Sequence, residues 1–233
     1  MADMSLHSFI TGHFLHHERP PSLGDIALQF ECSFDAARAG LRALADLHGV
    51  VLHPNSDEIW VAHPYSAAPT TCIVSTNGHG GRRWWANCVW CGFGILHAAI
   101  EPGAGSGKLE ARIGGIGDNV TLTVENGRLV EEDFVVHFPV AMREAWDNVI
   151  YTCSVQQLFR DEAEVDEWCR SRGIAKGDVR PVRQIWEFAG DWYARDRAET
   201  GWAKWTVQEA TGLFRRHGLC GPTWDLGGRD GRF

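Results

Sequence analysis

The residues of this chain with the clearest capacity for chemistry are its cysteines. Cys88 and Cys91 form the pair Cys-Val-Trp-Cys, within a total of 7 cysteines. A lone pair at this spacing has three interpretations: half of a zinc site, a redox dithiol, or two buried thiols without chemistry. A structural zinc site needs a second, similarly spaced pair, and the sequence has none. A thioredoxin-type pair opens a helix after a strand; the strand-like residues before Cys88 permit this, but the surrounding order of elements is not thioredoxin-like.

The other cysteines are spread along the chain, and their number is odd. Residues 1–6 are polar and acidic and have no features of a secretion signal, so we expect a cytoplasmic protein with free thiols. Cys153 stands alone and is considered below with the pair. We expect Cys32, Cys169 and Cys220 to be structural.

The composition is that of a globular protein. Of 233 residues, 44% are hydrophobic and 22% are charged, which predicts one compact core plus a smaller module. No apolar run approaches the roughly 18 residues that a membrane-spanning helix needs, so we predict no membrane span.

The N-terminal quarter has the pattern of a winged helix. Apolar spacing predicts helices over 5–17, 23–30 and 34–47, and the segments 50–53 and 58–62 read as a hairpin. Ser33 is suited to cap the third helix. The apolar residues expected to be buried in that helix are Phe34, Ala37, Leu41, Leu44 and Leu47.

A winged helix raises the possibility of DNA binding, but the charge argues against it. The net charge is −8, and the third helix offers only Arg38 and Arg42 to phosphates, opposed by Asp35 and Asp46. Because nucleic-acid binding needs clustered basic residues, we favour a packing module and predict no nucleic-acid partner.

The rest of the chain mixes strands and helices. Strands are predicted over 71–75, 109–113 and 132–140, and Asn126-Gly127 marks a tight turn within a hairpin over 119–130. Residues 82–100 begin as a strand and become helical near Gly92. The glycine-rich segment 114–119 is not a phosphate loop, because no Lys-Ser/Thr follows it and the next element is a strand. The segment 143–173 is predicted to hold one helix, a central segment around Tyr151 to Ser154, and a second helix at 161–172 that ends at Gly173. Further helices are predicted over 181–194 and 206–217, with Thr206 as the cap of the last one.

Two segments resemble a known family. The segment WWANCVWCGFGI (84–95) is similar to the active-site segment of the alkylmercury lyase (organomercurial lyase) family, in which an aromatic-rich strand delivers a nucleophilic cysteine. Cys88 falls on that cysteine. The segment CSVQQLFRDEAEVDEW (153–168) reproduces the family's spacing between a second essential cysteine, here Cys153, and a tryptophan in an acidic helix. The resemblance covers roughly 75–190 well, 1–74 loosely, and the last 40 residues not at all.

The resemblance implies an α+β fold, in which a mixed or antiparallel sheet is flanked by helices. It implies a winged-helix-like module over 1–64 and a catalytic core over 70–190. Beyond these we expect a helical C-terminal extension over 191–226 and a disordered tail over 227–233. The extension is a departure from the lyases that detoxify mercury.

The implied site consists of Cys88, Cys91 and Cys153, as catalytic residues and as ligands of a soft metal. Cleaving a carbon–mercury bond needs soft ligands for the metal and a proton for the departing carbon. The family supplies the proton from an aspartate three residues after the nucleophile, and that position is Cys91 here. A protonated thiol could donate the proton, or Cys91 could serve as a third sulfur ligand. The substitution could equally mark a family member with a different substrate.

Three functions therefore stay open. The first is a lyase that cleaves a carbon–metal bond of a small organometallic substrate, with mercury as the product ion and no required cofactor. The second is a thiol protein that sequesters a soft metal without turnover, and the third is a winged-helix regulator that senses metal.

Several residues near the pair have both a functional and a packing interpretation. They could adjust a thiol or line the pocket, but strand and core packing explains them as well. These residues are Trp84, Trp85, Asn87, Trp90, His97 and Tyr151.

Overall fold

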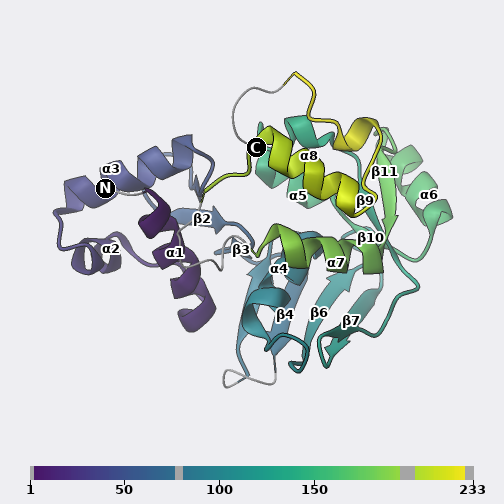
Figure 1. Cartoon of the computed structure of the whole chain (residues 1–233), viewed down its shortest axis with the longest axis horizontal. Coiled ribbons are helices and arrows are strands. Elements are labelled where there is room, and N and C mark those ends of the chain that lie inside the picture. Colours follow the sequence, from purple (N-terminus) through teal and green to yellow (C-terminus); the bar gives the residue numbers. More distant parts are fainter. Residues whose placement is uncertain (1–2, 77–80, 195–202, 229–233) are drawn as a thin grey trace.

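The computed structural model describes residues 3–76, 81–194 and 203–228, and begins with three helices. Each lies within two residues of its predicted range, and Ser33 caps the third as predicted, accepting the Ala36 N–H at 3.2 Å. The helices are α1 (Asp3–His17), α2 (Leu23–Gln29) and α3 (Phe34–Asp46). They lie together at one end of the molecule (Figure 1).

The predicted buried face of α3 is correct at its centre and wrong at its ends. Ala37, Leu41 and Leu44 are buried, but Phe34 is 59% exposed and Leu47 is 47% exposed. Phe34 is the first helical residue and Leu47 is the C-cap. Apolar spacing extends to both ends of the helix, whereas burial reaches only its middle turns.

The predicted hairpin after α3 joins a larger sheet. Strands β1 (Val51–Leu52) and β2 (Ile59–Ala62) pair antiparallel, and β2 also pairs with β3 (Tyr65–Ser66). The sheet has eight strands in the order β1-β2-β3-β5-β4-β6-β7-β8, and each neighbouring pair is antiparallel. The remaining strands are β4 (Cys72–Thr76), β5 (Arg83–Ala86), β6 (Gly107–Arg112), β7 (Asn119–Glu125) and β8 (Arg128–Leu129). The sheet therefore runs without a break through the boundary predicted near residue 64.

Helix α4 (Val89–Ala99) follows β5 directly and is buried along nearly its whole length. It packs on β4, β5 and β6 and against α7 (Val182–Trp192), so it lies between the sheet and a covering helix (Figure 1). Two glycines allow this close approach. A Cβ at Gly92 would lie 2.6 Å from the Leu109 side chain, and one at Gly94 would overlap the ring of Tyr193.

We predict that Gly94→Ala destabilises the protein by about 1–3 kcal/mol, because the added methyl group forces the buried Tyr193 ring to move. Gly12→Ala is the matched control. It lies within α1 with no atom within 4 Å of an added Cβ, so we expect it to stabilise by about 0.5–1 kcal/mol through helix propensity. Urea unfolding of the two variants measures both effects. Equal stability of Gly94→Ala and the parent would contradict the close contact.

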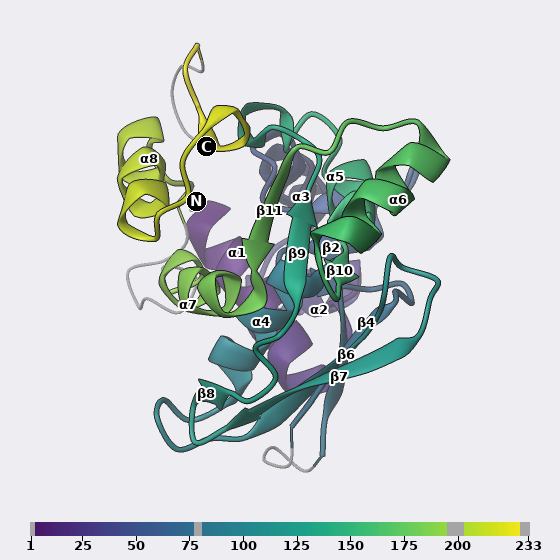
Figure 2. The same ribbon diagram turned by 90° about the vertical axis from the view of Figure 1, so that its right-hand side faces the viewer.

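A second, smaller sheet stands beyond the first (Figure 2). Its central strand, β9 (Val135–Phe138), was predicted, whereas β10 (Leu158–Phe159) and β11 (Asp178–Pro181) were not. Short strands like these carry little periodicity, and both depend on pairing with β9. Two helices connect its strands in sequence: α5 (Val149–Val155) lies between β9 and β10, and α6 (Glu162–Arg172) lies between β10 and β11. Helix α6 spans nearly its predicted range and is followed by Gly173 in the left-handed region.

The C-terminal helix α8 (Val207–Arg216) packs on α7 through aromatic rings. Phe188 and Trp192 of α7 contact Phe214 of α8 with centroid separations of 5.8 Å in both cases. Trp90 of α4 stacks on Phe188 at 5.1 Å. The predicted extension is thus joined to the core helix that carries the cysteine pair. Of the predicted disordered tail, residues 229–233 lie outside the described residues.

Among the described helices, none combines the length and the hydropathy that crossing a membrane requires.

Candidate functional site

The cysteine pair lies at the junction of β5 and α4. Cys88 is the N-cap of α4, in extended conformation, and its sulfur accepts the backbone N–H of Cys91 at 3.5 Å. A cap position projects its side chain back over the first turn. The Cys88 and Cys91 sulfurs therefore lie 3.4 Å apart as free thiols.

Cys153 reaches the same point from a distant part of the chain. It lies in α5, whose N-terminus is capped by the side chain of Asn148. The Cys153 sulfur lies within 4.8 Å of the Cys91 sulfur and of a ring nitrogen of His63. The sequence placed Cys153 in a segment between two helices, whereas the structure places it within a short helix. All three thiols are buried, with exposures of 2%, 1% and 6% for Cys88, Cys91 and Cys153.

Three further side chains, which sequence reasoning missed, contact the thiols. His63 Nδ1 lies 3.8 Å from the Cys91 sulfur, and the Tyr193 hydroxyl donates to the same sulfur at 3.5 Å. The Cys88 thiol donates to Oε1 of Gln156 at 3.3 Å. His63 and Tyr193 follow no motif or spacing, so only the fold brings them to the cysteines. Gln156 lies three residues after Cys153, within the segment 153–168.

The three thiols influence one another's ionisation, and their surroundings shift their pKa values in different directions. Burial, then hydrogen bonds to Cys153 and Cys91, raise the pKa of Cys88. A hydrogen bond with Cys88 lowers the pKa of Cys153, but its hydrogen bond with Cys91 and its burial outweigh that effect and raise it. Burial would also raise the pKa of Cys91, yet hydrogen bonds from Cys153 and Cys88, together with His63, hold it well below its usual range. The arrangement favours one thiolate, on Cys91, beside two protonated thiols.

The neighbouring groups are compatible with a single negative charge on Cys91. Burial and the charge of Cys91 raise the pKa of Tyr193, so its hydroxyl stays protonated and can donate. Burial and the proximity of His63 lower the pKa of His7 to about 3, which leaves His7 neutral at pH 7. Tyr193 and His7 therefore add no charge next to the Cys91 thiolate.

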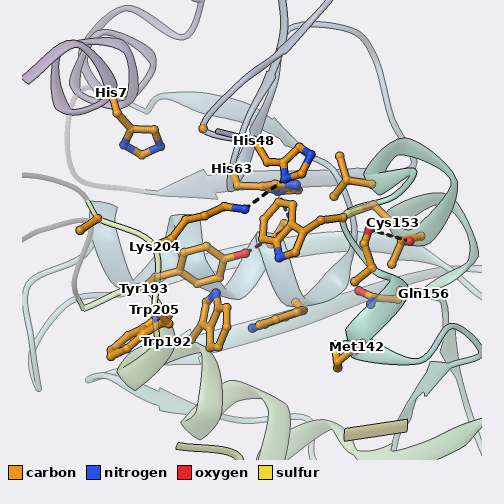
Figure 3. A pocket seen from close by; sticks show the side chains of 18 residues that line it. His7, His48, His63, Met142, Cys153, Gln156, Trp192, Tyr193, Lys204 and Trp205 are labelled. Carbon is orange, nitrogen blue, oxygen red and sulfur yellow. Dashed lines mark hydrogen bonds between the residues drawn. The ribbon is translucent and has the colours of Figure 1, made fainter. Parts of the chain in front are cut away.

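A cavity of about 70 Å³ lies beside Cys91 and Cys153 (Figure 3). A water molecule needs roughly 10–15 Å³ of such volume, so the cavity has room for a small organic group. The N-terminal module contributes His7 and His48 to its lining, and the C-terminal extension contributes residues 203–205. The described residues that line it also include His63, Trp90, Met142, Trp146, Gln156, Trp192 and Tyr193.

The C-terminal extension therefore forms part of the pocket wall. Lys204 Nζ lies 3.1 Å from Nδ1 of His48 and 5.1 Å from the ring centroid of Trp146. Figure 3 shows Lys204 and Trp205 on the side of the pocket opposite Cys153 and Gln156. The sequence predicted the extension without indicating this role.

The other residues for which both a functional and a packing interpretation were open either pack in the core or line a second cleft. His97 stacks on Trp186 with centroids 3.8 Å apart and contacts the Trp186 carbonyl, so it packs away from the thiols. Asn87 and Tyr151 line a separate cleft of about 680 Å³ on the other side of Cys153. Of the aromatic residues at 84, 85 and 90, only Trp90 lines the thiol pocket.

A model of the alkylmercury lyase family, MerB, matches residues 65–194, more than half of the chain. The chain belongs to the alkylmercury lyase family. A crystal structure of the mercury-bound form of MerB2 has a TM-score of 0.65 and 15% sequence identity, covering 82% of this chain and 91% of that chain. No curated protein sequence matches the chain.

The structural match confirms the expected fold: N-terminal helices followed by antiparallel sheets with flanking helices, as in alkylmercury lyases. The family match includes all three cysteines of the site and Tyr193. It excludes His63, which lies two residues before the matched range, and Lys204, which lies after it. The pocket of this family member thus combines a matched core with residues from both flanking parts of the chain.

Proposed function

We propose that this protein is a thiol-dependent lyase that cleaves the carbon–metal bond of a small organomercurial by protonolysis. The observation that carries the proposal is the convergence of Cys88, Cys91 and Cys153 beside a cavity that can hold a small organic group. Membership of the alkylmercury lyase family supports it. Thiolates are the ligands that a soft metal prefers.

The reaction needs no redox partner. The Cys91 thiolate displaces the departing ligand of the organomercurial and forms a sulfur–mercury bond. A protonated thiol, Cys88 or Cys153, then gives its proton to the carbon. The electron pair of the carbon–mercury bond forms the new carbon–hydrogen bond, the hydrocarbon leaves, and the newly formed thiolate binds the mercuric ion. Tyr193 donates a hydrogen bond to Cys91 and so stabilises its thiolate form.

Anaerobic incubation with methylmercury tests this proposal. We expect release of one methane per mercury consumed, with the mercuric ion initially held by the protein. Excess small thiol should remove the ion and allow further turnover. Mercury bound without methane release would contradict lyase activity.

Sequestration without turnover is the alternative that the same site suggests. A third sulfur at position 91 should hold the mercuric product more tightly than an oxygen ligand would. Under this alternative, the methylmercury experiment gives stoichiometric metal binding and no hydrocarbon.

DNA binding by the N-terminal module is not part of the proposed function. The two arginines of α3 are paired with Asp57, Arg38 at 2.6 Å and Arg42 at 3.0 Å, so they are not available as a basic face. We predict that the full-length protein shows no salt-sensitive binding to duplex DNA, measured by fluorescence anisotropy between about 50 and 200 mM salt. In a matched variant, Asp57→Asn removes the partner that both arginines share and frees Arg42, whereas Arg38 keeps its ion pair with Asp35 at 2.6 Å. Tight, salt-sensitive binding by the parent protein would refute the prediction.

A further inference from the structure

His63 adds a nitrogen donor to the thiols of the pocket. The potential ligand atoms of His63, Cys91 and Cys153 all lie within 4.8 Å of one another. The Cys91 sulfur lies between two of its neighbours, 3.8 Å from His63 Nδ1 and 3.4 Å from the Cys88 sulfur. Cys88 adjoins this group through the Cys91 sulfur, so the four side chains form one continuous cluster.

The spacing of this cluster fits a tetrahedral cation. Zinc takes sulfur ligands at about 2.3 Å and nitrogen ligands at about 2.0–2.1 Å. In a regular tetrahedron these bonds put two sulfurs roughly 3.8 Å apart and a sulfur and a nitrogen roughly 3.5 Å apart. The observed separations of 3.4 Å and 3.8 Å differ from these values by only a few tenths of an ångström. The ligand atoms of His63, Cys91 and Cys153 lie within 4.8 Å of one another. Cys88 is outside that group of three, so its sulfur must move farther than this to complete the tetrahedron.

The cluster is held in place before any ion arrives. His63 lies between β2 and β3, the cysteine pair begins α4, and Cys153 lies in α5. The three thiols are buried in the core, and the Cys88 cap fixes the first turn of α4. Three sulfurs and one imidazole form the Cys3His donor set of structural zinc sites. The family resemblance implies a site of two thiols and a carboxylate. Such a site would lack both the third sulfur and the imidazole.

The charge of the cluster also suits a divalent cation. Three thiols in mutual contact cannot all ionise in a buried pocket, because the thiolates repel one another and burial disfavours charge. A bound divalent cation removes this obstacle, since it neutralises two thiolates and releases their protons. The Nε2 atom of His63 is buried and has no hydrogen-bond partner among the described residues. A water molecule in the adjoining cavity could satisfy that atom as an outer ligand of the site.

We propose that His63, Cys88, Cys91 and Cys153 form a binding site for a borderline divalent cation, of which Zn²⁺ is the best fit. Binding of this cation does not depend on carbon–mercury cleavage. It keeps the thiols protected and ordered until a softer metal displaces it.

Cobalt is the probe, because Co²⁺ replaces Zn²⁺ in tetrahedral sites and is visible spectroscopically. The reduced full-length protein is titrated with Co²⁺ under argon. We expect one equivalent to bind, with thiolate-to-cobalt charge transfer and the intense d–d bands of tetrahedral coordination. One equivalent of Zn²⁺ should then abolish these bands. An octahedral spectrum without charge transfer would overturn the proposal.

Variants assign the ligands. His63→Gln should shift the d–d bands and weaken Zn²⁺ binding about 100-fold or more, since loss of even an outer partner of a metal ligand costs about 10- to 100-fold. Cys169→Ser is the matched control. Its thiol is buried and lies 3.6 Å from a histidine, His137, but outside the pocket, so its spectrum and affinity should equal those of the parent.

An unchanged spectrum and affinity in His63→Gln would overturn the assignment of His63. Circular dichroism confirms that each variant is folded, and Cys91→Ser gives a second test, by loss of charge-transfer intensity, should His63→Gln fail to fold. None of these measurements uses hydrocarbon release. Failure of the lyase proposal and failure of the zinc proposal are therefore distinguishable.

Discussion

Cys88→Ser should reduce methane release from methylmercury by about 10³-fold or more, an effect typical of losing a central member of a catalytic group. The serine hydroxyl keeps the shape of the side chain but replaces a soft sulfur by a hard oxygen, and it is a far weaker acid than a thiol. Both the metal contact and the proton are lost. The helix cap remains, because a serine oxygen accepts the Cys91 N–H as well as the sulfur does. Gas chromatography of the headspace measures the rate.

The control for this prediction is Cys169→Ser, which changes a buried thiol outside the pocket. We expect its methane release to match that of the parent. If Cys88→Ser also released methane at the parent's rate, Cys88 would have no role in the reaction.

Substitutions at Cys91 should test its role as the thiolate that attacks the metal. We expect Cys91→Asp to retain methane release, because a carboxylate can also contact the metal while Cys88 and Cys153 still hold protons. It should loosen the mercuric product, because one sulfur ligand is lost. Cys91→Ala should lose most turnover, since no anionic ligand remains at that position to attack the metal. Rates and mercury affinity are measured on both variants, the latter by competition with a small thiol.

The alternatives give different patterns. If the protein only sequesters metal, Cys91→Asp weakens binding and no methane appears. If Cys91 is only a packing residue, both variants bind mercury as the parent does, with a small loss of stability from the altered core. Either pattern would contradict a direct role for Cys91 in turnover.

The sequence by itself determined most of the local elements. It also identified Cys88, Cys91 and Cys153 as candidates for the site. Helix caps such as Ser33 and Thr206 act through neighbouring backbone atoms, so their side chains mark helix starts without any tertiary information. The hairpin turn at Asn126-Gly127 is local in the same way, with both residues at positive φ. The two cysteine segments carry enough local pattern to indicate the family, which the comparison confirms.

The tertiary structure decided which residues surround those cysteines. His63, Gln156 and Tyr193 contact the thiols from sequence separations of 28, 68 and 102 residues. No periodicity records contacts of that range, because they depend on how whole elements pack. Gly94 leaves room for the ring of Tyr193. His63 lies in the connection between the paired strands β2 and β3, and this pairing places its imidazole beside the Cys91 sulfur. The ionisation of the thiols follows from the same packing: burial and mutual contact distinguish Cys91 from Cys88, although in sequence both are simply members of one pair.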